Sequence, residues 1–318
     1  MLVASLRVAN LCRGSASFAR WSRAAAVAAG VGIALTAVPA LAQVQAAGQI
    51  GEPVPWGMGM QASAGVIKER VGNLHDLLLV IITLITIFVL ALLAYVAVRF
   101  RADRNPNPSR TSHNTTIEVI WTVVPVLILV VIAVPSFRLL YFMDRAVNPD
   151  MTVKVTAFQW AWEYEYPDHE GLKFESYMVP TDQLQPGQRR LLDVDNELVV
   201  PAGKDIRVLV TSRDVIHSLF VPSLGLQKYG IPGRTLEAWF RVDRPGVYYG
   251  QCNQICGVNH AFMPIVVRAV PEAEFTAWVA QARQRFANDN TRAPAPVAAA
   301  ESGVMRLASE QIGGISQK

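Results

Sequence analysis

Two long apolar segments, neither containing a charged residue, constrain the fold of this chain more than any other feature. Residues 77–98 form a run of 22 positions and residues 119–137 a run of 19 positions. Each run is long enough for a helix to cross the hydrocarbon core of a bilayer. A pair of buried core helices is the alternative, but neither run has the polar stripe of a surface helix. We therefore predict two transmembrane helices that form a hairpin.

The connection between the two spans, residues 99–118, gives the hairpin an orientation. Its first part contains a single acid, Asp103, against four basic residues, Arg99, Arg101, Arg104 and Arg110. An excess of arginine in a short loop marks the cytoplasmic side of a membrane. The segment 43–76 and the region after residue 137 are therefore predicted to lie on the outer side, which is the periplasm if this is a bacterial inner-membrane protein.

Residues 1–42 have the features of a secretory signal peptide. They contain no acidic residue, an apolar run over 24–41, small residues at the end, and four basic residues, Arg7, Arg13, Arg20 and Arg23. This pattern predicts cleavage before Gln43. A third transmembrane helix is the alternative, but glycines and a proline interrupt the run. Cleavage would also remove Cys12 and leave Cys252 and Cys256 as the cysteines of the mature chain.

The region 150–270 has the pattern of an all-β domain. Short runs rich in Val, Phe, Trp and Tyr alternate with turns such as Pro186-Gly187 and Pro232-Gly233, which predicts a sandwich of two sheets. The candidate strands are 152–158, 162–166, 191–194, 198–200, 206–211, 237–241, 246–250 and 263–269. A short amphipathic helix is expected at 271–286, followed by a disordered tail at 287–318.

Residue types that are able to bind copper are concentrated within residues 250–264. Thiolate, thioether and imidazole groups together favour copper over hard cations, and a weak methionine ligand is typical of electron-transfer copper. A disulfide between the two cysteines and a closed tetrahedral zinc site are alternatives. Neither of them explains the methionine. The candidate ligands are Cys252, Gln254 through its backbone, Cys256, His260 and Met263, with His217 lying 35 residues upstream of the first cysteine.

The order His…Cys-x3-Cys-x3-His-x2-Met closely resembles the dinuclear copper (CuA) loop of subunit II of haem–copper cytochrome c oxidases. The resemblance covers about residues 53–280 and implies a cupredoxin-like Greek-key sandwich behind the two-helix hairpin. It also implies that Cys252 and Cys256 bridge both coppers, and that His217 and His260 each cap one. Met263 and the carbonyl of Gln254 would be the weak ligands.

One departure from the family concerns Gln254, where relatives usually have glutamate. The family's glutamate binds copper through its carbonyl and reaches a magnesium ion at the interface with subunit I through its carboxylate. A neutral amide is a poorer ligand for a hard dication. We therefore expect the copper site to survive and the magnesium site to be weakened or absent.

Two further residues take roles from the resemblance. Trp160, within an aromatic stretch over 158–166, matches the tryptophan that accepts electrons from cytochrome c, although aromatic residues in a strand are usually core. Glu118 matches the glutamate at the opening of a proton-uptake channel of the catalytic subunit, although an acid at a helix start often serves only the helix dipole.

The outer region carries net negative charge. Residues 150–275 contain 16 acidic and 12 basic residues, which favours basic soluble partners, although an ordinary solvated face is the alternative. By the resemblance, Glu165, Asp195 and Asp214 match acids that dock cytochrome c. Arg213 departs from this pattern, because the neighbouring position is often acidic in relatives, so we expect a weaker patch or a different cytochrome. His75, His113 and His169 lack metal-ligand companions in the sequence, so we interpret them as surface or interfacial residues.

These observations predict an electron-relay subunit of a bacterial cytochrome c oxidase. Its expected partners are cytochrome c, subunit I with its haems and third copper, subunit III and the inner membrane, with no role for nucleic acid. A copper-free quinol oxidase subunit II is one alternative, and the intact ligand set argues against it. A membrane-tethered copper chaperone or thiol oxidoreductase, using the two cysteines as a reactive pair, is the other.

Overall fold

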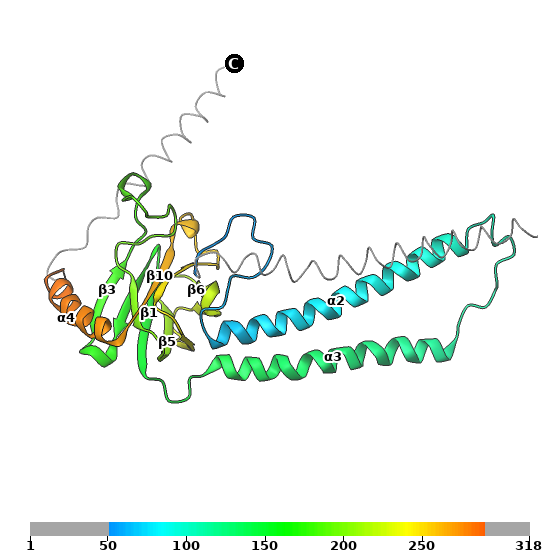
Figure 1. Cartoon of the computed structure of the whole chain (residues 1–318), viewed down its shortest axis with the longest axis horizontal. Helices are drawn as coiled ribbons and strands as arrows, with labels where there is room; N and C mark the ends of the chain where they lie inside the picture. The colour runs from blue at the N-terminus through cyan, green and yellow to red at the C-terminus, as the bar shows by residue number, and fades with distance from the viewer. Residues whose placement is uncertain (1–50, 290–318) are drawn as a thin grey trace, which may run out of the picture. The chain divides into compact units, whose positions relative to one another are not determined.

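The computed structural model describes residues 51–289. The predicted signal peptide over 1–42 and the predicted tail beyond residue 289 lie outside this range. Within it, the first elements are two long helices that run side by side, α2 (Val66–Arg99) and α3 (Thr115–Asp144) (Figure 1). Their apolar windows have no buried residue, as expected of helices whose side chains face lipid. The predicted hairpin is thus present.

Both helices are longer than the apolar spans. α2 begins at Val66, eleven residues before the predicted span, and α3 continues past residue 137 to Asp144. Asn114 caps the start of α3, because its side-chain oxygen accepts the backbone N–H groups of Thr116 and Ile117. Two prolines, at 125 and 135, lie inside α3. They are tolerated in membrane helices where neighbouring groups satisfy the freed carbonyls.

The strands between residues 151 and 270 form a β-sandwich, which confirms the predicted fold class. A five-stranded sheet has the order β3-β2-β1-β5-β8, a three-stranded sheet the order β4-β10-β9, and β6 pairs with β7. β1 is parallel to β5 and β10 is parallel to β4, whereas the other pairs are antiparallel. The strands are β1 (Met151–Phe158), β2 (Ala161–Tyr166), β3 (Leu172–Ser176), β4 (Leu198–Pro201), β5 (Asp205–Ser212), β6 (His217–Val221), β7 (Leu226–Gly230), β8 (Leu236–Arg241), β9 (Gly246–Gln251) and β10 (Pro264–Val270).

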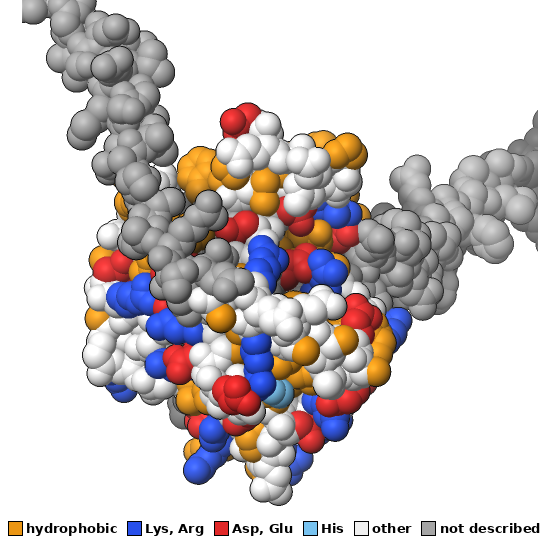
Figure 2. Space-filling view, turned by 90° about the vertical axis from the view of Figure 1, so that its left-hand side faces the viewer, with side chains coloured by type: hydrophobic (Ala, Val, Ile, Leu, Met, Phe, Trp, Pro, Cys, Tyr) orange, Lys and Arg blue, Asp and Glu red, His pale blue; other side chains and the backbone are white. Residues whose placement is uncertain are grey.

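The core follows from the alternation of side chains along the strands. In β5 every second residue is buried. The side chains of Trp162, Tyr164 and Tyr166 in β2 lie on the same face of the sheet as these buried residues and are also in the core. The opposite parity of β2 carries Glu163 and Glu165, so both glutamates lie on the other face of the sheet. On the side of the molecule seen in Figure 2, basic and acidic side chains are interspersed rather than gathered into one field.

The strand predictions were wrong at four places. Residues 191–194 form a turn with one isolated bridge, between Val194 and Met178, instead of a strand. β3, β6 and β7 were not predicted. They are five residues each, and every residue of each strand pairs with a neighbouring strand, so pairing stabilises them more than their own composition does.

The last described element is α4 (Glu272–Asp289), which ends three residues beyond the predicted helix. Its buried side chains recur every three or four residues, at Phe275, Val279, Ala282 and Phe286. This spacing is that of one face of an amphipathic helix.

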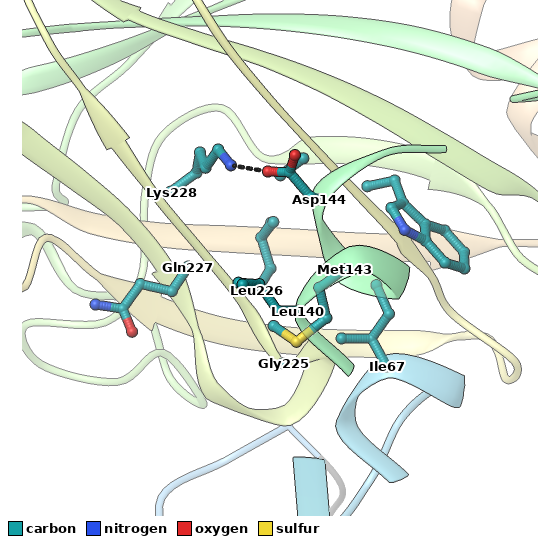
Figure 3. Close-up of a pocket in the computed structure, with 10 residues that line it drawn as sticks. Ile67, Leu140, Met143, Asp144, Gly225, Leu226, Gln227 and Lys228 are labelled. Atoms are coloured by element: carbon teal, nitrogen blue, oxygen red, sulfur yellow. Dashed lines mark hydrogen bonds and ion pairs between the residues drawn. The ribbon is translucent and has the colours of Figure 1, made fainter. Parts of the chain in front are cut away.

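The start of α2 and the end of α3 meet the sandwich beside β7 and β8. The indole N–H of Trp239 donates to the carbonyl of Phe142 at 2.8 Å, and the two rings pack edge to face. A pocket of about 140 Å³ lies next to this contact (Figure 3). Its rim carries an ion pair of 3.2 Å between Lys228 Nζ and Asp144 Oδ1. Its apolar lining includes Ile67, Leu140, Met143 and Leu226.

Candidate metal centre

The centre is assembled at one end of the sandwich from two chain segments. Cys252 directly follows β9, and His217 is the first residue of β6. The strands approach closely at Gly250, where a Cβ atom would lie 2.2 Å from the carbonyl oxygen of Phe220. This close approach requires glycine and places the end of β9 beside β6. The ligand atoms of His217, Cys252 and Cys256 consequently lie within 4.8 Å of one another, and all three residues are buried.

The loop between the cysteines surrounds this cluster with further donors. The Sγ atoms of Cys252 and Cys256 are 3.8 Å apart and both thiols are free, whereas a disulfide requires about 2.0 Å. His260 Nδ1 lies 3.6 Å from Cys256 Sγ, and the carbonyl oxygen of Gln254 lies 3.3 Å from Cys252 Sγ. Met263 is buried, and its carbonyl accepts the backbone N–H of Cys252 at 3.1 Å.

Asp214 orients His217. The Nε2 atom of His217 lies 2.9 Å from Asp214 Oδ1, and an ionised carboxylate only accepts, so Nε2 carries the proton and donates. In the neutral imidazole the lone pair is then on Nδ1, which is buried near the cysteine thiols. A carboxylate that fixes a histidine tautomer in this way is a common support for a metal-binding imidazole. Burial lowers the pKa of His217, but Cys252 and Asp214 outweigh burial and the net direction is upward.

The two thiols have unequal acidity in the metal-free protein. Burial raises the pKa of Cys252, but His217 and the backbone at Ser218 lower it more, to about 6. Burial and the charge on Cys252 raise the pKa of Cys256 to about 12. One thiolate is therefore stabilised locally, while the second is disfavoured by the first. A bound cation would remove this repulsion, and metal binding would release a proton.

This donor set fits a soft metal. The cluster offers two sulfurs, the buried Nδ1 of His217, the nearby Nδ1 of His260 and a carbonyl oxygen. Sulfur and imidazole donors suit copper or zinc and are poor ligands for magnesium or calcium.

Trp160 lies directly against the cysteine loop. It stands in the turn between β1 and β2, is half-buried, and donates its indole N–H to the carbonyl of Cys256 at 3.2 Å. The side-chain amide of Gln159 donates to the same carbonyl at 2.8 Å. Gly257 has φ +124°, and a Cβ atom there would lie 2.9 Å from the indole ring. The contact between the turn and the loop thus depends on glycine at this position.

Two family models cover most of the described chain. The model for the periplasmic domain of cytochrome c oxidase subunit II matches residues 151–270, and the model for its transmembrane domain matches residues 53–139. The chain belongs to the cytochrome c oxidase subunit II family. The resemblance inferred from the ligand motif is therefore confirmed, and the chain is a membrane-anchored subunit of a respiratory oxidoreductase.

Relatives in this family come from bacteria and from plants. A probable cytochrome c oxidase subunit 2 of Rickettsia bellii is 49% identical over 237 residues, covering 74% of this chain and 88% of that protein. Cytochrome c oxidase subunit 2 of Oenothera berteroana is 48% identical over 231 residues, covering 71% of this chain and 90% of that protein. The crystal structure of the periplasmic domain of subunit II from Bradyrhizobium japonicum is 46% identical, with a TM-score of 0.42, covering 45% of this chain and 99% of that one.

The remaining predicted residues are spread over the molecule. Glu118 lies in the first turn of α3, where its carboxylate accepts the backbone N–H of Asn114 at 3.3 Å. Glu165 forms an ion pair with Lys154 at 3.1 Å. Asp195 accepts the backbone N–H of Tyr177 at 2.7 Å.

Sequence reasoning missed the role of Asp214 toward His217. It interpreted this carboxylate only as an acid that docks cytochrome c, whereas the carboxylate accepts a hydrogen bond from the imidazole. The Asp-x-x-His spacing at 214–217 could have suggested this contact.

Proposed function

We propose that this subunit relays single electrons from cytochrome c through a dinuclear copper centre to the haems of subunit I, where oxygen is reduced. The proposal rests mainly on the cluster formed by the side chains of His217, Cys252 and Cys256. Trp160 lies beside this cluster and donates a hydrogen bond to the carbonyl of Cys256. A centre of this kind, when bound, holds one electron delocalised over two metals.

The protein contributes a rigid set of donors. Cys252, Cys256, His217 and His260 would hold the metals, and the carbonyl of Gln254 and the thioether of Met263 would be weaker ligands. The cysteines, His217 and Met263 are buried, and Asp214 holds His217 in one tautomer. Ligands that are already oriented need little rearrangement when the charge changes, which favours rapid electron transfer.

Metal content tests this proposal directly. The full chain, purified in detergent and loaded with copper, should bind two coppers and give a mixed-valence electron paramagnetic resonance spectrum. One copper per chain, or stable zinc in place of copper, would contradict the proposal.

The thiol oxidoreductase alternative requires an accessible reactive cysteine. Both cysteines are buried in this structure, which supports a ligand role instead. Copper that remains bound through repeated oxidation and reduction would exclude the alternative.

Electrons would arrive through Trp160. Its indole contacts the backbone of a proposed ligand, so Trp160→Gln should slow electron transfer from cytochrome c while binding stays nearly unchanged. Asp195→Asn should do the reverse, raising KM and flattening the salt dependence. Glu165→Gln should resemble Asp195→Asn, because both acids are proposed to dock cytochrome c. If the Trp160 and Asp195 variants changed the electron-transfer rate, KM and the salt dependence in the same way, the distinction between an electron acceptor and a docking surface would be wrong.

Asp214 needs a separate expectation. Its carboxylate also holds His217, so Asp214→Asn should alter the copper spectrum as well as the docking. A normal spectrum in this variant would leave docking as its role.

Glu118 is proposed to stand at the opening of a proton-uptake path on the cytoplasmic side. Glu118→Gln should then lower turnover of the assembled oxidase without altering the copper spectrum. The hydrogen bond that Glu118 accepts from the backbone N–H of Asn114 also fits a residue that only stabilises the start of a helix. Unchanged turnover would leave Glu118 with that role alone.

The outer domain is proposed to lie in the periplasm of a bacterial inner membrane. The arginines between α2 and α3 support this orientation. Protease added to the periplasmic side of spheroplasts should cleave the outer domain and spare the connection at 100–114.

An interfacial magnesium ion is proposed to be weak or absent because position 254 is glutamine. Metal analysis of the oxidase grown with manganese tests this, and Gln254→Glu should raise occupancy. A tightly held stoichiometric ion in the unaltered oxidase would contradict it.

A further inference from the structure

A nearly buried carboxylate lies on the outer face of the five-stranded sheet. Glu163 of β2 is only 5% exposed, and an ionised carboxylate at such a position requires cationic partners. Lys173 Nζ lies 2.9 Å from Glu163 Oε2, and the guanidinium of Arg213 pairs with the same oxygen. Arg213 also reaches Glu175 Oε1 at 3.4 Å. Two strands, β2 and β3, are thus bound to one side chain from the segment between β5 and β6.

Arg213 suits this position better than lysine would. Its planar guanidinium contacts two carboxylates from two strands and lies 4.8 Å from the centre of the Phe158 ring. An arginine can make both kinds of contact at once, whereas a lysine presents a single point charge. Lys173 already provides a point charge to Glu163.

The next residue in the chain, Asp214, faces the metal centre. Its Oδ2 accepts the backbone N–H of Gln159 at 2.6 Å, and its Oδ1 accepts from His217 Nε2 at 2.9 Å and from the N–H of Val215 at 2.6 Å. Gln159 directly precedes Trp160. One carboxylate therefore connects the turn that carries Trp160 to the imidazole of His217.

We propose that Arg213 is a positioning residue, whose ion pair with Glu163 fixes the 212–216 segment so that Asp214 keeps its bonds to His217 and Gln159. The backbone N–H of Arg213 also donates to the carbonyl of Ala157 at 3.0 Å, so the segment is held by its backbone and by its side chain. The effect on copper rests on the proposed function, whereas the anchoring of Asp214 does not.

Hydrogen exchange in the copper-free full chain tests the anchoring. The amides of Gln159 and Val215 both donate to Asp214, so Arg213→Gln should increase their exchange rates by about tenfold relative to the amides of β1 and β5. Arg213→Lys should give an intermediate increase, because it keeps the charge and loses the second carboxylate.

Arg268→Gln is a matched control. Arg268 pairs with Glu197 in the three-stranded sheet, so its loss removes a similar ion pair and should leave the exchange of Gln159 and Val215 unchanged. Wild-type exchange at both amides in Arg213→Gln, or an equal increase throughout the sandwich, would overturn the proposal.

Two further variants keep the test informative if Arg213→Gln folds poorly. Glu175→Gln removes only the more exposed carboxylate and should increase exchange less. The double variant Glu163→Gln with Arg213→Gln removes both charges. It should fold better than Arg213→Gln alone, which leaves the buried Glu163 carboxylate with Lys173 as its remaining cationic partner. Exchange in the double variant at the wild-type rate would also overturn the proposal.

The copper-loaded chain supplies a second readout. Arg213→Gln should change the hyperfine pattern of the electron paramagnetic resonance spectrum and increase the rate of copper loss to a chelator by about tenfold, with Arg213→Lys partly restoring both. Arg268→Gln should change neither. Absence of two coppers in the wild type would refute the proposed function, whereas the exchange results would still decide the role of Arg213.

Discussion

The hairpin and the sandwich place their apolar side chains in opposite directions. In α2 and α3 the large apolar residues are exposed over most of their length, whereas the strands of the sandwich bury theirs completely at residues such as Val208 and Phe240. The hairpin faces the lipid hydrocarbon, which accepts any apolar side chain as long as the apolar segment is long enough to cross it. The sandwich requires side chains of particular shape, because a packed interior tolerates neither cavities nor extra volume. In the hairpin, a substitution should be tolerated if the new side chain is apolar. In the sandwich, it should be tolerated only if the new side chain also fits the space at that buried position.

Cys256→Ser should have the largest effect. A hydroxyl is a far poorer ligand than a thiolate for a soft metal, so bound copper should fall to background while the helices remain inserted. The measurement is the ratio of copper to protein in the purified full chain. Asn253→Ala, an exposed change in the same loop, is the control and should leave the ratio unchanged. Retention of copper by Cys256→Ser would show that the loop is not the site.

Phe240→Ala tests the positional demand of the sandwich. Phe240 is fully buried, and removal of its ring should lower the free energy of unfolding by about 3–5 kcal/mol. Denaturant unfolding followed by circular dichroism at a wavelength dominated by strands would measure the loss. Leu84→Ala in the exposed face of α2 should leave this transition in place. Similar losses for both variants would break the comparison between the two regions.

Leu84→Arg tests the compositional demand of the hairpin. A charge near the centre of a membrane span costs about 2.5–3.5 kcal/mol in insertion, so the inserted fraction should fall. Alkaline extraction of membranes would measure that fraction. Leu84→Phe should insert like the wild type, since only apolar character is required there. Full insertion of the arginine variant would indicate that Leu84 faces a protein partner or water instead of lipid.

Trp239→Phe tests the place where the two regions meet and should have the smallest effect. The change keeps a ring against Phe142 and removes the indole N–H that donates to the Phe142 carbonyl. The expected loss is about 1 kcal/mol in the free energy of unfolding. Trp56→Phe is the control, because Trp56 is 98% exposed. A loss above that of Phe240→Ala would mean that the junction, and not the core, dominates stability.

Much of the metal centre could be predicted because its ligands are close together in the chain. Cys252, Cys256, His260 and Met263 lie within twelve residues, so their spacing marked the loop as a candidate site, and the structure brings His217 to the two cysteines. The partners of Arg213 could not be identified in this way. Glu163 and Glu175 lie 50 and 38 residues away, and only the pairing of β2 with β3 and the path of β5 bring them to the guanidinium. The strands β6 and β7 were missed for a related reason, since pairing stabilises them more than their own composition does.

The sequence by itself determined the two membrane spans, the all-β domain and the cluster of soft side chains at 252–263. These depend on length, hydropathy, alternation and local spacing, which are properties of contiguous residues. The tertiary structure decided which nitrogen of His217 carries the proton, that Asp214 serves this imidazole, and that Arg213 is held by a buried carboxylate. Those features arise between segments that are distant in the chain. Hydrogen bonds and ion pairs depend on distances of a few ångströms, which only the packed strands establish.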